Sequence, residues 1–370
     1  MEIGILTFHF AYNYGALLQC YALQEYLTSC GHDVKIINYI PPNVKHRPYW
    51  NQLISRKLSI SKVLKIIKKI QYAPLQNKEF DLFRKTHLNL TEVFSYEKLS
   101  KINNEFDAII VGSDQIWNPS QHKIGSYFLS HLKQFKGKRI SYAPCCAYNK
   151  VDSEVKGQLV KALSDFHAIS VRNKETQRFV FDLVNHKPPL VVDPTLLWNF
   201  NEFYNEKPLI VGDYILTYIL GKEIKGGHKK IIARLKEKYP KHQIVSVILT
   251  ENNPQLFNWS DKTYWCADTI EWLNMFNHAS FIYTDSFHGL LFGIKFKKPF
   301  IAFYAEQARS SRFIDLAQRF GNIENNIVES FDDAVKKDSF NQIIDFSDLE
   351  EKIKVEVNKS VSFLTQSLIR

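Results

Sequence analysis

A histidine follows the end of a predicted strand in the run Thr284-Asp285-Ser286-Phe287-His288-Gly289. Apolar residues over 279–283 predict the strand, and apolar spacing over 290–296 predicts a helix. A helix that starts at a strand's carboxyl end directs backbone N–H groups and partial positive charge at a ligand, which favours an anion. Ser286 fits the N-cap, so His288 falls in the first turn. The residues indicate either an anion site with a titratable group or a hydrogen-bonded structural histidine.

Two further strand ends carry groups suited to an anion. The turn at Asn13, Tyr14 and Gly15 opens a predicted helix, whose backbone N–H groups could bind an anion. Arg172 directly follows the predicted strand 168–171. The alternative interpretation of Arg172 is a surface ion pair.

A third strand end carries groups suited to a saccharide. Ser113, Asp114 and Gln115 follow the predicted strand 106–111, and Trp117 is close by. Carboxylate and amide groups bind sugar hydroxyls, while an aromatic ring packs on the apolar face of a sugar. The alternative for this segment is a plain turn.

Several common catalytic signatures are missing from the sequence. The stretch 221–227 lacks the lysine of a P-loop, and there is no G-x-G-x-x-G after the first strand, no G-x-S-x-G and no H-E-x-x-H. The five cysteines form no C-x-x-C pair, so we expect free, mostly buried thiols and no metal site. These absences disfavour a dinucleotide dehydrogenase, an α/β-hydrolase and a metalloprotease.

The length and composition predict two globular domains. The chain has 370 residues, 45% of them hydrophobic and 14% aromatic. No apolar run approaches the roughly 18 residues of a membrane span. Met1 leads directly into a strand-like segment without a signal-peptide pattern, so we expect a cytoplasmic protein.

Strand and helix patterns alternate twice along the chain. The first alternation covers 1–197, and a polar stretch with Pro208 and Gly212 separates it from the second, over 209–340. A final amphipathic helix in 341–370 is expected to pack back across both domains. These patterns predict an α/β fold of two Rossmann-like domains facing a cleft.

The net charge of +10 is concentrated in one segment. Of the 48 Lys and Arg residues, ten lie between positions 34 and 78, where there is no Asp or Glu. Within an insertion at about 45–78, helical spacing of apolar residues predicts a basic amphipathic helix. The apolar residues are Ile60, Val63, Leu64, Ile67 and Ile70. Its candidate partners are the protein core, an anionic membrane surface or nucleic acid, and nucleic acid is not expected because no binding module is recognisable.

Taken together, the motifs resemble the polysaccharide pyruvyl transferase family. The resemblance runs from Gly4 to about Gly321 and rests on short motifs in the same order. They are Asn13-Tyr14-Gly15-Ala16, Gly112-Ser113-Asp114-Gln115 with Trp117, Ser141-Tyr142-Ala143, Ser170-Val171-Arg172, Asp193-Pro194-Thr195, Ser286-Phe287-His288-Gly289 and Ser311-Arg312. One segment departs from the family pattern: Pro144-Cys145-Cys146-Ala147 stands where a small Ala-Ser-Phe-Gly run is usual.

The resemblance implies a GT-B-like fold and transfer of the enolpyruvyl group of phosphoenolpyruvate to a sugar as a cyclic ketal, with release of phosphate. The sugar would be a hexose such as galactose, in a lipid- or nucleotide-linked saccharide for bacterial capsule or exopolysaccharide. Phosphoenolpyruvate is the donor substrate, and no cofactor is expected.

Roles follow for the residues that match the motifs. His288 is the expected general acid and Asp114 the base. Donor binding is assigned to Arg172, Arg312, Ser286 and the turn Asn13, Tyr14, Gly15, and acceptor binding to Ser113, Gln115 and Trp117. A helix N-terminus disfavours the imidazolium form by about 0.3–1 kcal/mol, but a bound phosphate and carboxylate favour it at close range.

Two alternatives share this fold and its anion site. One is a GT-B glycosyltransferase that uses a nucleotide sugar, and the other is a non-catalytic saccharide-binding protein. If the acceptor is linked to polyprenyl diphosphate, the basic helix would hold the enzyme at the inner face of the plasma membrane as a peripheral protein.

Overall fold

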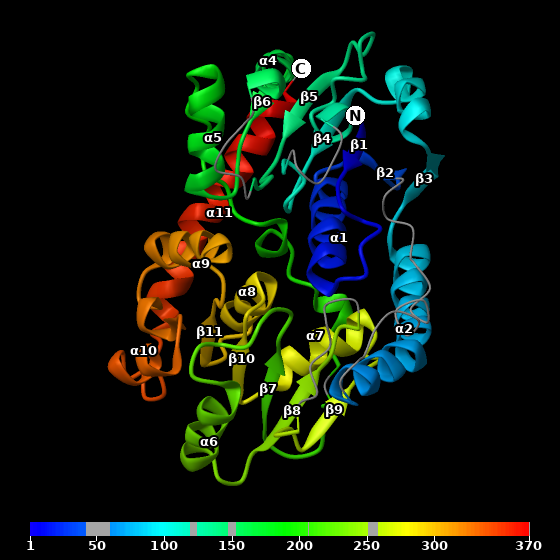
Figure 1. Cartoon of the computed structure of the whole chain (residues 1–370). Helices are drawn as coiled ribbons and strands as arrows, with labels where there is room; N and C mark the ends of the chain where they lie inside the picture. Colours follow the sequence, from blue (N-terminus) through cyan, green and yellow to red (C-terminus); the bar gives the residue numbers. More distant parts are fainter. Residues whose placement is uncertain (42–59, 119–123, 147–152, 206, 251–257, 370) are drawn as a thin grey trace.

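Two parallel six-stranded sheets form the body of the molecule (Figure 1). The computed structural model describes residues 1–41, 60–118, 124–146, 153–205, 207–250 and 258–369. Helices connect the parallel strands within each sheet. This arrangement confirms the predicted α/β class with two Rossmann-like units.

The first sheet has the order β3-β2-β1-β4-β5-β6. Its strands are β1 (Glu2–Leu6), β2 (Asp33–Tyr39), β3 (Leu90–Phe94), β4 (Ala108–Val111), β5 (Lys138–Ser141) and β6 (Ala168–Ile169). The connecting helices include α1 (Tyr14–Ser29), α2 (Ile60–His87), α3 (Ile124–Tyr127), α4 (Ser153–Ser164) and α5 (Lys174–Val184). The central strand β4 is buried along its whole length, as its continuous apolar run predicts.

The second sheet repeats this pattern with the order β12-β11-β10-β7-β8-β9. Its strands are β7 (Tyr214–Tyr218), β8 (Gln243–Val247), β9 (Lys262–Tyr264), β10 (Phe281–Thr284), β11 (Phe300–Phe303) and β12 (Ile327–Val328). The helices here are α6 (His228–Lys238), α7 (Thr269–His278), α8 (Phe287–Lys295), α9 (Gln307–Phe320) and α10 (Phe331–Lys336).

Each sheet therefore has one switch point, between β1 and β4 in the first and between β7 and β10 in the second. At such a point the chain leaves two neighbouring strands in opposite directions and opens a crevice at their carboxyl ends, where ligands bind. The Asn13 turn and Asp114 follow β1 and β4, and Ser286 follows β10. These predicted site residues therefore lie at the switch points of both sheets, whereas Arg172 follows the edge strand β6 and Arg312 lies in α9.

Helix α2 contacts both halves of the molecule and lies along one side of it (Figure 1). Its Gln76 side chain donates to the carbonyl oxygens of Ile248 and Trp265 in the second half, and Arg84 donates to Ala11 in the first. The predicted basic helix is thus the first part of a longer one. Of the predicted basic residues, Lys45, Arg47, Arg56 and Lys57 lie outside the described part of the chain.

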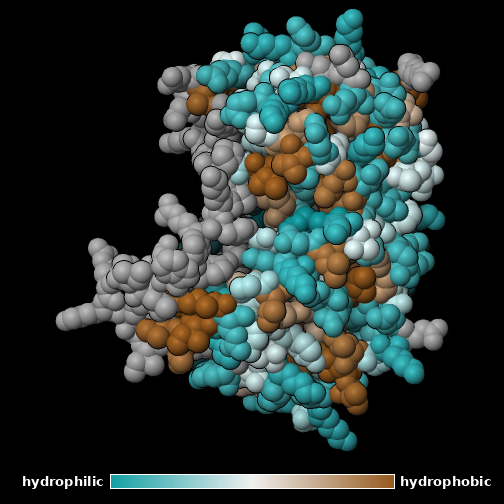
Figure 2. Space-filling view, turned by 90° about the vertical axis from the view of Figure 1, so that its right-hand side faces the viewer, coloured by the Kyte–Doolittle hydropathy of each residue, from teal (hydrophilic) through white to brown (hydrophobic). Residues whose placement is uncertain are grey.

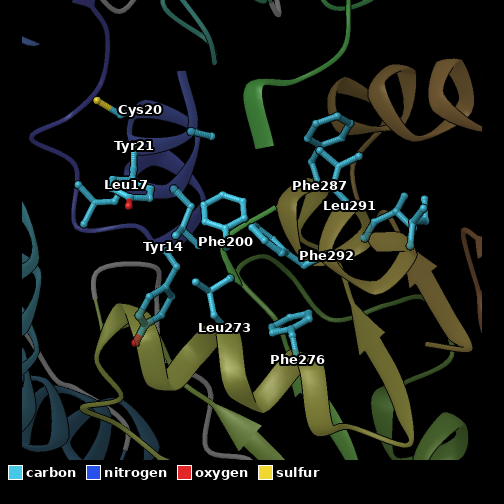
Figure 3. Close-up of a cluster of buried hydrophobic side chains, with 14 of the residues drawn as sticks. Tyr14, Leu17, Cys20, Tyr21, Phe200, Leu273, Phe276, Phe287, Leu291 and Phe292 are labelled. Atoms are coloured by element: carbon cyan, nitrogen blue, oxygen red, sulfur yellow. The ribbon is translucent and has the colours of Figure 1, made fainter. Parts of the chain in front are cut away.

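Helix α11 (Phe346–Leu368) also joins the two halves. Its Ser360 hydroxyl accepts a hydrogen bond from Val192 N at 2.9 Å, and its Glu356 pairs with Arg319 of α9. Between the sheets, aromatic side chains from α1, α7 and α8 pack together (Figure 3). Tyr14 stacks on Trp272 with 5.4 Å between ring centroids, and its hydroxyl donates to Ala267 O at 2.7 Å.

Candidate active site

The junction between β10 and α8 has the local structure that the sequence predicts. Ser286 caps α8, because its Oγ accepts a hydrogen bond from Gly289 N at 3.1 Å. Thr284 closes the turn from the other side, with Ser286 N donating to its Oγ1 at 3.0 Å. His288 lies in the first helical turn and is only 7% exposed.

Asp285 has a structural role at this junction. Its two carboxylate oxygens accept hydrogen bonds from Leu220 N at 2.6 Å and Gly221 N at 2.7 Å. Asp285 therefore holds the loop that follows β7.

The His288 ring packs against the start of α1 in the other half of the molecule. A Cβ built on Gly15 would lie 2.2 Å from both Cγ and Nδ1 of the ring, so only glycine fits at position 15. Asn13 caps α1 by accepting from Ala16 N at 3.1 Å. The two predicted anion-binding turns, one in each half, are thus brought into contact.

Asp193 lies under both His288 and Arg172, and the site assignment from sequence missed it. Its Oδ2 accepts a hydrogen bond from Arg172 Nη1 and is 3.4 Å from His288 Nε2. Its Oδ1 accepts from Thr195 N at 3.0 Å. Burial raises the pKa of the Asp193 carboxyl, but His288 and Arg172 outweigh burial and hold that pKa well below its usual range.

The sequence contained a signal for Asp193. Asp193 follows the strand-like run 190–192 and precedes Pro194, which is the pattern of an N-cap before a short helix. Only the folded chain places this cap between residues of both halves.

Arg172 is an internal residue, so the alternative of a surface ion pair is wrong. It is 3% exposed, and its Nη2 lies 3.4 Å from Asp114 Oδ1. Its Nε donates to Cys145 Sγ at 3.0 Å. Burial raises the pKa of the Cys145 thiol, which keeps it protonated and makes it a poor nucleophile.

Arg312 approaches the site from α9. Its guanidinium carbon lies 5.9 Å from the Phe287 ring centroid, and that of Arg172 lies 4.6 Å from the same centroid. Both arginines line one pocket between the two halves of the molecule. The other residues that line this pocket are Asn173, Val192, Asp193, Leu196, Phe287, Leu291, Asp315, Leu316, Arg319 and Phe320.

The acceptor assignment requires a correction at Trp117. This side chain is fully buried, stacks on Phe128, and donates its Nε1–H to Tyr127 O at 3.0 Å. It belongs to the core of the first half and cannot present a ring face to a sugar. The chain turns inward here because Asp114 adopts a left-handed conformation with φ 74°.

Ser113 and Tyr14 are also structural side chains. The Ser113 hydroxyl is fully buried and donates to Ala143 O at 2.8 Å, so it is not available to a sugar. The Tyr14 ring is fully buried between the two halves, which leaves only its backbone to contribute to an anion site. Asp114 and Gln115 are partly exposed.

Solved structures with this two-domain arrangement share the fold at low sequence identity. The Anabaena Alr3699/HepE complex with UDP and glucose superposes with a TM-score of 0.55 at 9% identity, covering 99% of this chain and 98% of that one. Arabidopsis thaliana UGT89C1 with UDP-L-rhamnose gives a TM-score of 0.54 at 10% identity, covering 99% and 97%. Methanocaldococcus jannaschii UDP-GlcNAc 2-epimerase, in complex with UDP-GlcNAc and UDP, gives 0.51 at 15% identity, covering 99% and 100%.

These similarities show a GT-B-like fold over the whole chain and say nothing about its substrate. None of the curated proteins compared with this sequence matches it significantly. A family model, by contrast, matches residues 13–306, which contain every assigned site residue except Arg312. The chain belongs to the polysaccharide pyruvyl transferase family.

Proposed function

We propose that this protein transfers the enolpyruvyl group of phosphoenolpyruvate to two hydroxyls of a sugar, forming a cyclic ketal and releasing phosphate. The observation that carries the proposal is the convergence of Arg172 and His288 on Asp193 at a helix N-terminus, with Arg312 beside Phe287. Phosphoenolpyruvate carries a carboxylate and a phosphate on neighbouring atoms. Two guanidinium groups and a helix start match this pair of anions.

Donor binding would rearrange an existing contact. The 3.4 Å pair between Arg172 and Asp114 is long for a charged hydrogen bond, so a bidentate substrate carboxylate can displace it. Displacement frees Asp114 for the acceptor. Arg172 keeps its hydrogen bond to the buried Asp193, which preserves the orientation of its guanidinium group.

His288 is the proposed general acid for carbon protonation. The phosphate and carboxylate of a bound donor would favour the charged imidazolium form of His288, because opposite charges interact strongly in a buried site. Asp193 Oδ2 lies 3.4 Å from Nε2, within ion-pair distance of the ring. Contact with Gly15 fixes the other side of the ring.

The proposed reaction balances as follows. The proton from His288 adds to the methylene carbon of phosphoenolpyruvate and leaves C2 electrophilic. The first sugar hydroxyl attacks C2 and gives its proton to Asp114. The C2–O bond to phosphate then breaks, the second hydroxyl forms the other C2–O bond, and its proton leaves with phosphate. Asp114 returns its proton to His288 through solvent, so one proton in total moves to carbon and one to phosphate.

The acceptor is proposed to be a hexose in a lipid- or nucleotide-linked saccharide for bacterial surface polysaccharide. Asp114 and Gln115 at the end of β4 would bind its hydroxyls. A polyprenyl-diphosphate carrier would present the sugar near a membrane. Such a location fits the surface of α2 described below.

The test is incubation of the protein with phosphoenolpyruvate and a panel of saccharide acceptors. We expect acceptor-dependent phosphate release and an acceptor whose mass increases by one pyruvyl ketal. Arg312→Lys should raise KM for phosphoenolpyruvate, and Asp114→Asn should lower kcat. Nucleotide release from a UDP- or TDP-sugar, with no phosphate from phosphoenolpyruvate, would establish the glycosyltransferase alternative instead.

A binding measurement separates an enzyme from a passive saccharide-binding protein. Phosphoenolpyruvate that binds only the native state stabilises it by RT ln(1 + [L]/Kd), so the melting temperature rises with the logarithm of its concentration once that exceeds Kd. We expect this shift for the wild type and a smaller one for Arg312→Lys. A saccharide that stabilises the protein when phosphoenolpyruvate does not would contradict the proposal.

A further inference from the structure

Helix α2 presents a row of aliphatic side chains to solvent. Leu64, Ile67, Leu75 and Leu82 are 47%, 49%, 52% and 55% exposed. The 3.6-residue repeat places Leu64 and Ile67 on one side of the segment before the internal Pro74, and Leu75 and Leu82 on the corresponding side of the segment after it. We call this row, together with Gln71, Lys78 and Lys85 on the same side, the outer face of α2. A packed helix normally turns its apolar side inward and its polar side outward.

The opposite side of α2 is anchored by polar contacts that fix the rotation of the helix. Gln76 is fully buried, donates to Ile248 O and Trp265 O at 2.9 Å each, and accepts from Thr250 N at 2.9 Å. Arg84, one of the side chains on this inner side, bonds Ala11 O at 3.3 Å. Rotating α2 to bury its outer face would leave these buried polar groups without hydrogen-bond partners, which is unfavourable. The outward position of the aliphatic row is therefore a fixed feature of the fold.

The charged side chains around the outer face are positive along most of its length. Between Val34 and Lys78 the sequence has Lys and Arg but no Asp or Glu. Lys78 and Lys85 lie within the aliphatic row and are exposed, and Lys68 borders it with its ammonium group over the rings of Tyr72 and Trp265. Figure 2 views the molecule from the side of α2 and shows apolar patches among hydrophilic surface on this face.

We propose that the outer face of α2 docks on an anionic membrane surface. Aliphatic side chains flanked by lysines match the boundary between acyl chains and anionic headgroups, where apolar burial and charge attraction act together. None of the helices in the described part of the chain is long and apolar enough to cross a bilayer, so the contact is peripheral. Because the anchored side of α2 contacts both halves of the molecule, docking holds both halves of the site near the membrane. This inference does not depend on the proposed chemistry.

The test is co-sedimentation of the full-length protein with vesicles, in the absence of any substrate. We expect binding to phosphatidylglycerol-containing vesicles to exceed binding to pure phosphatidylcholine by about tenfold or more, and to fall at high salt. The triple variant L64Q/I67Q/L75Q should lose about tenfold in binding to the anionic vesicles. Its matched control is V335Q/I343Q/V355Q, which replaces three aliphatic side chains that are exposed elsewhere and should bind like the wild type.

A second pair of variants tests the charge contribution. K78Q/K85Q removes two charges from the outer face, whereas K336Q/K354Q removes two exposed charges from other helices. The first pair should weaken binding to anionic vesicles several-fold and the second should not. Melting temperatures of all variants show whether they are folded.

Three results would overturn the proposal. The first is a wild-type protein that stays in the supernatant with anionic vesicles at low salt. The second is equal vesicle binding by L64Q/I67Q/L75Q and its control. The third is a stable dimer in solution that only the outer-face variants abolish, because a second copy of the chain would then be the occupant. Activity with a water-soluble acceptor should be unaffected by every variant, which separates failure of this proposal from failure of the proposed reaction.

Discussion

The ring of His288 rests directly on the backbone of Gly15, across the boundary between the two sheets: a Cβ at position 15 would lie 2.2 Å from Cγ and Nδ1. A glycine in the first turn of α1 therefore determines where an imidazole from α8 can lie. Because real Cβ atoms do not approach other atoms so closely, an alanine at position 15 must push the ring away.

Gly15→Ala should lower kcat by about 10²-fold, since a displacement near 1 Å of a catalytic group can have that effect. The matched control is Gly157→Ala in α4, where a Cβ would meet nothing within 4 Å. We expect that control to keep full activity and to stabilise the protein by about 0.5–1 kcal/mol. Wild-type kcat in Gly15→Ala would refute the positioning of His288.

Asp193 and His288 should act as a unit. His288→Gln should lower kcat at saturating phosphoenolpyruvate by about 10²-fold or more, as expected for loss of a general acid. If Asp193 works through His288, the double variant with Asp193→Asn should be little worse than the single variants. Multiplicative losses would show that the two residues act independently.

Arg172→Lys tests the need for a planar, bidentate cation. Lysine keeps the charge but loses the fork that contacts Asp193 and Asp114, so kcat/KM for phosphoenolpyruvate should fall by about tenfold or more. Arg178→Lys is the control, since Arg178 is an exposed residue on α5 with an i,i+4 partner. Equal kinetics for the two variants would exclude Arg172 from donor binding.

The buried His228 should make stability depend on pH in the acid range. Burial lowers the pKa of His228 from its ordinary value of 6.5 to about 4. As pH falls, His228 is therefore protonated at a higher pH in the unfolded chain than in the folded protein, which favours unfolding. The free energy of unfolding should fall by about 2–3 kcal/mol as pH drops from 6.5 through 4. Denaturant titrations of His228→Gln should show a shallower fall, and those of the exposed His186→Gln should match the wild type. A wild-type slope in His228→Gln would assign the effect to other groups.

Glu356 and Glu350 of α11 allow a matched comparison of a partly buried and an exposed ion pair. Glu356 neutralises Arg319, whose Nη1 donates to Arg172 O at 2.9 Å. Glu356→Gln should destabilise the protein by about 3 kcal/mol and lower activity through the Arg172 backbone. Glu350→Gln removes only a surface pair with Lys297 and should change stability by less than about 1 kcal/mol. Calorimetry and steady-state kinetics on both variants would distinguish these outcomes.

Local sequence signals were sufficient wherever one short segment determines its own structure. The strand, N-cap and helix at Ser286 need only neighbouring residues, and the structure has all three. The alternation of strands and helices likewise identified both Rossmann-like units. The short strands β3, β9 and β12 went unpredicted, because two to five residues carry too little periodicity.

Local sequence patterns did not predict the position of a side chain where a contact with a distant part of the chain determines it. Trp117 is close to Asp114 in sequence, but the left-handed residue between strand and tryptophan turns the ring into the core. Asp193 meets His288 only after two sheets have packed together. The rotation of α2 depends on Gln76, whose partners lie in the segments that follow β8 and β9. The apolar stripe alone could not indicate that Leu64 and Ile67 face solvent.

The place of α11 in the chain has a consequence for how the protein is made. Its Ser360 binds Val192, and its Glu356 holds Arg319 against the Arg172 carbonyl, yet α11 is synthesised after the entire second sheet. While the second half is still being translated, α11 does not yet exist. Its contacts with Val192 and Arg319 have therefore not formed, and the region of Arg172 lacks part of its hydrogen bonding. The first unit to emerge is thus completed only when α11 has been synthesised and packs against it.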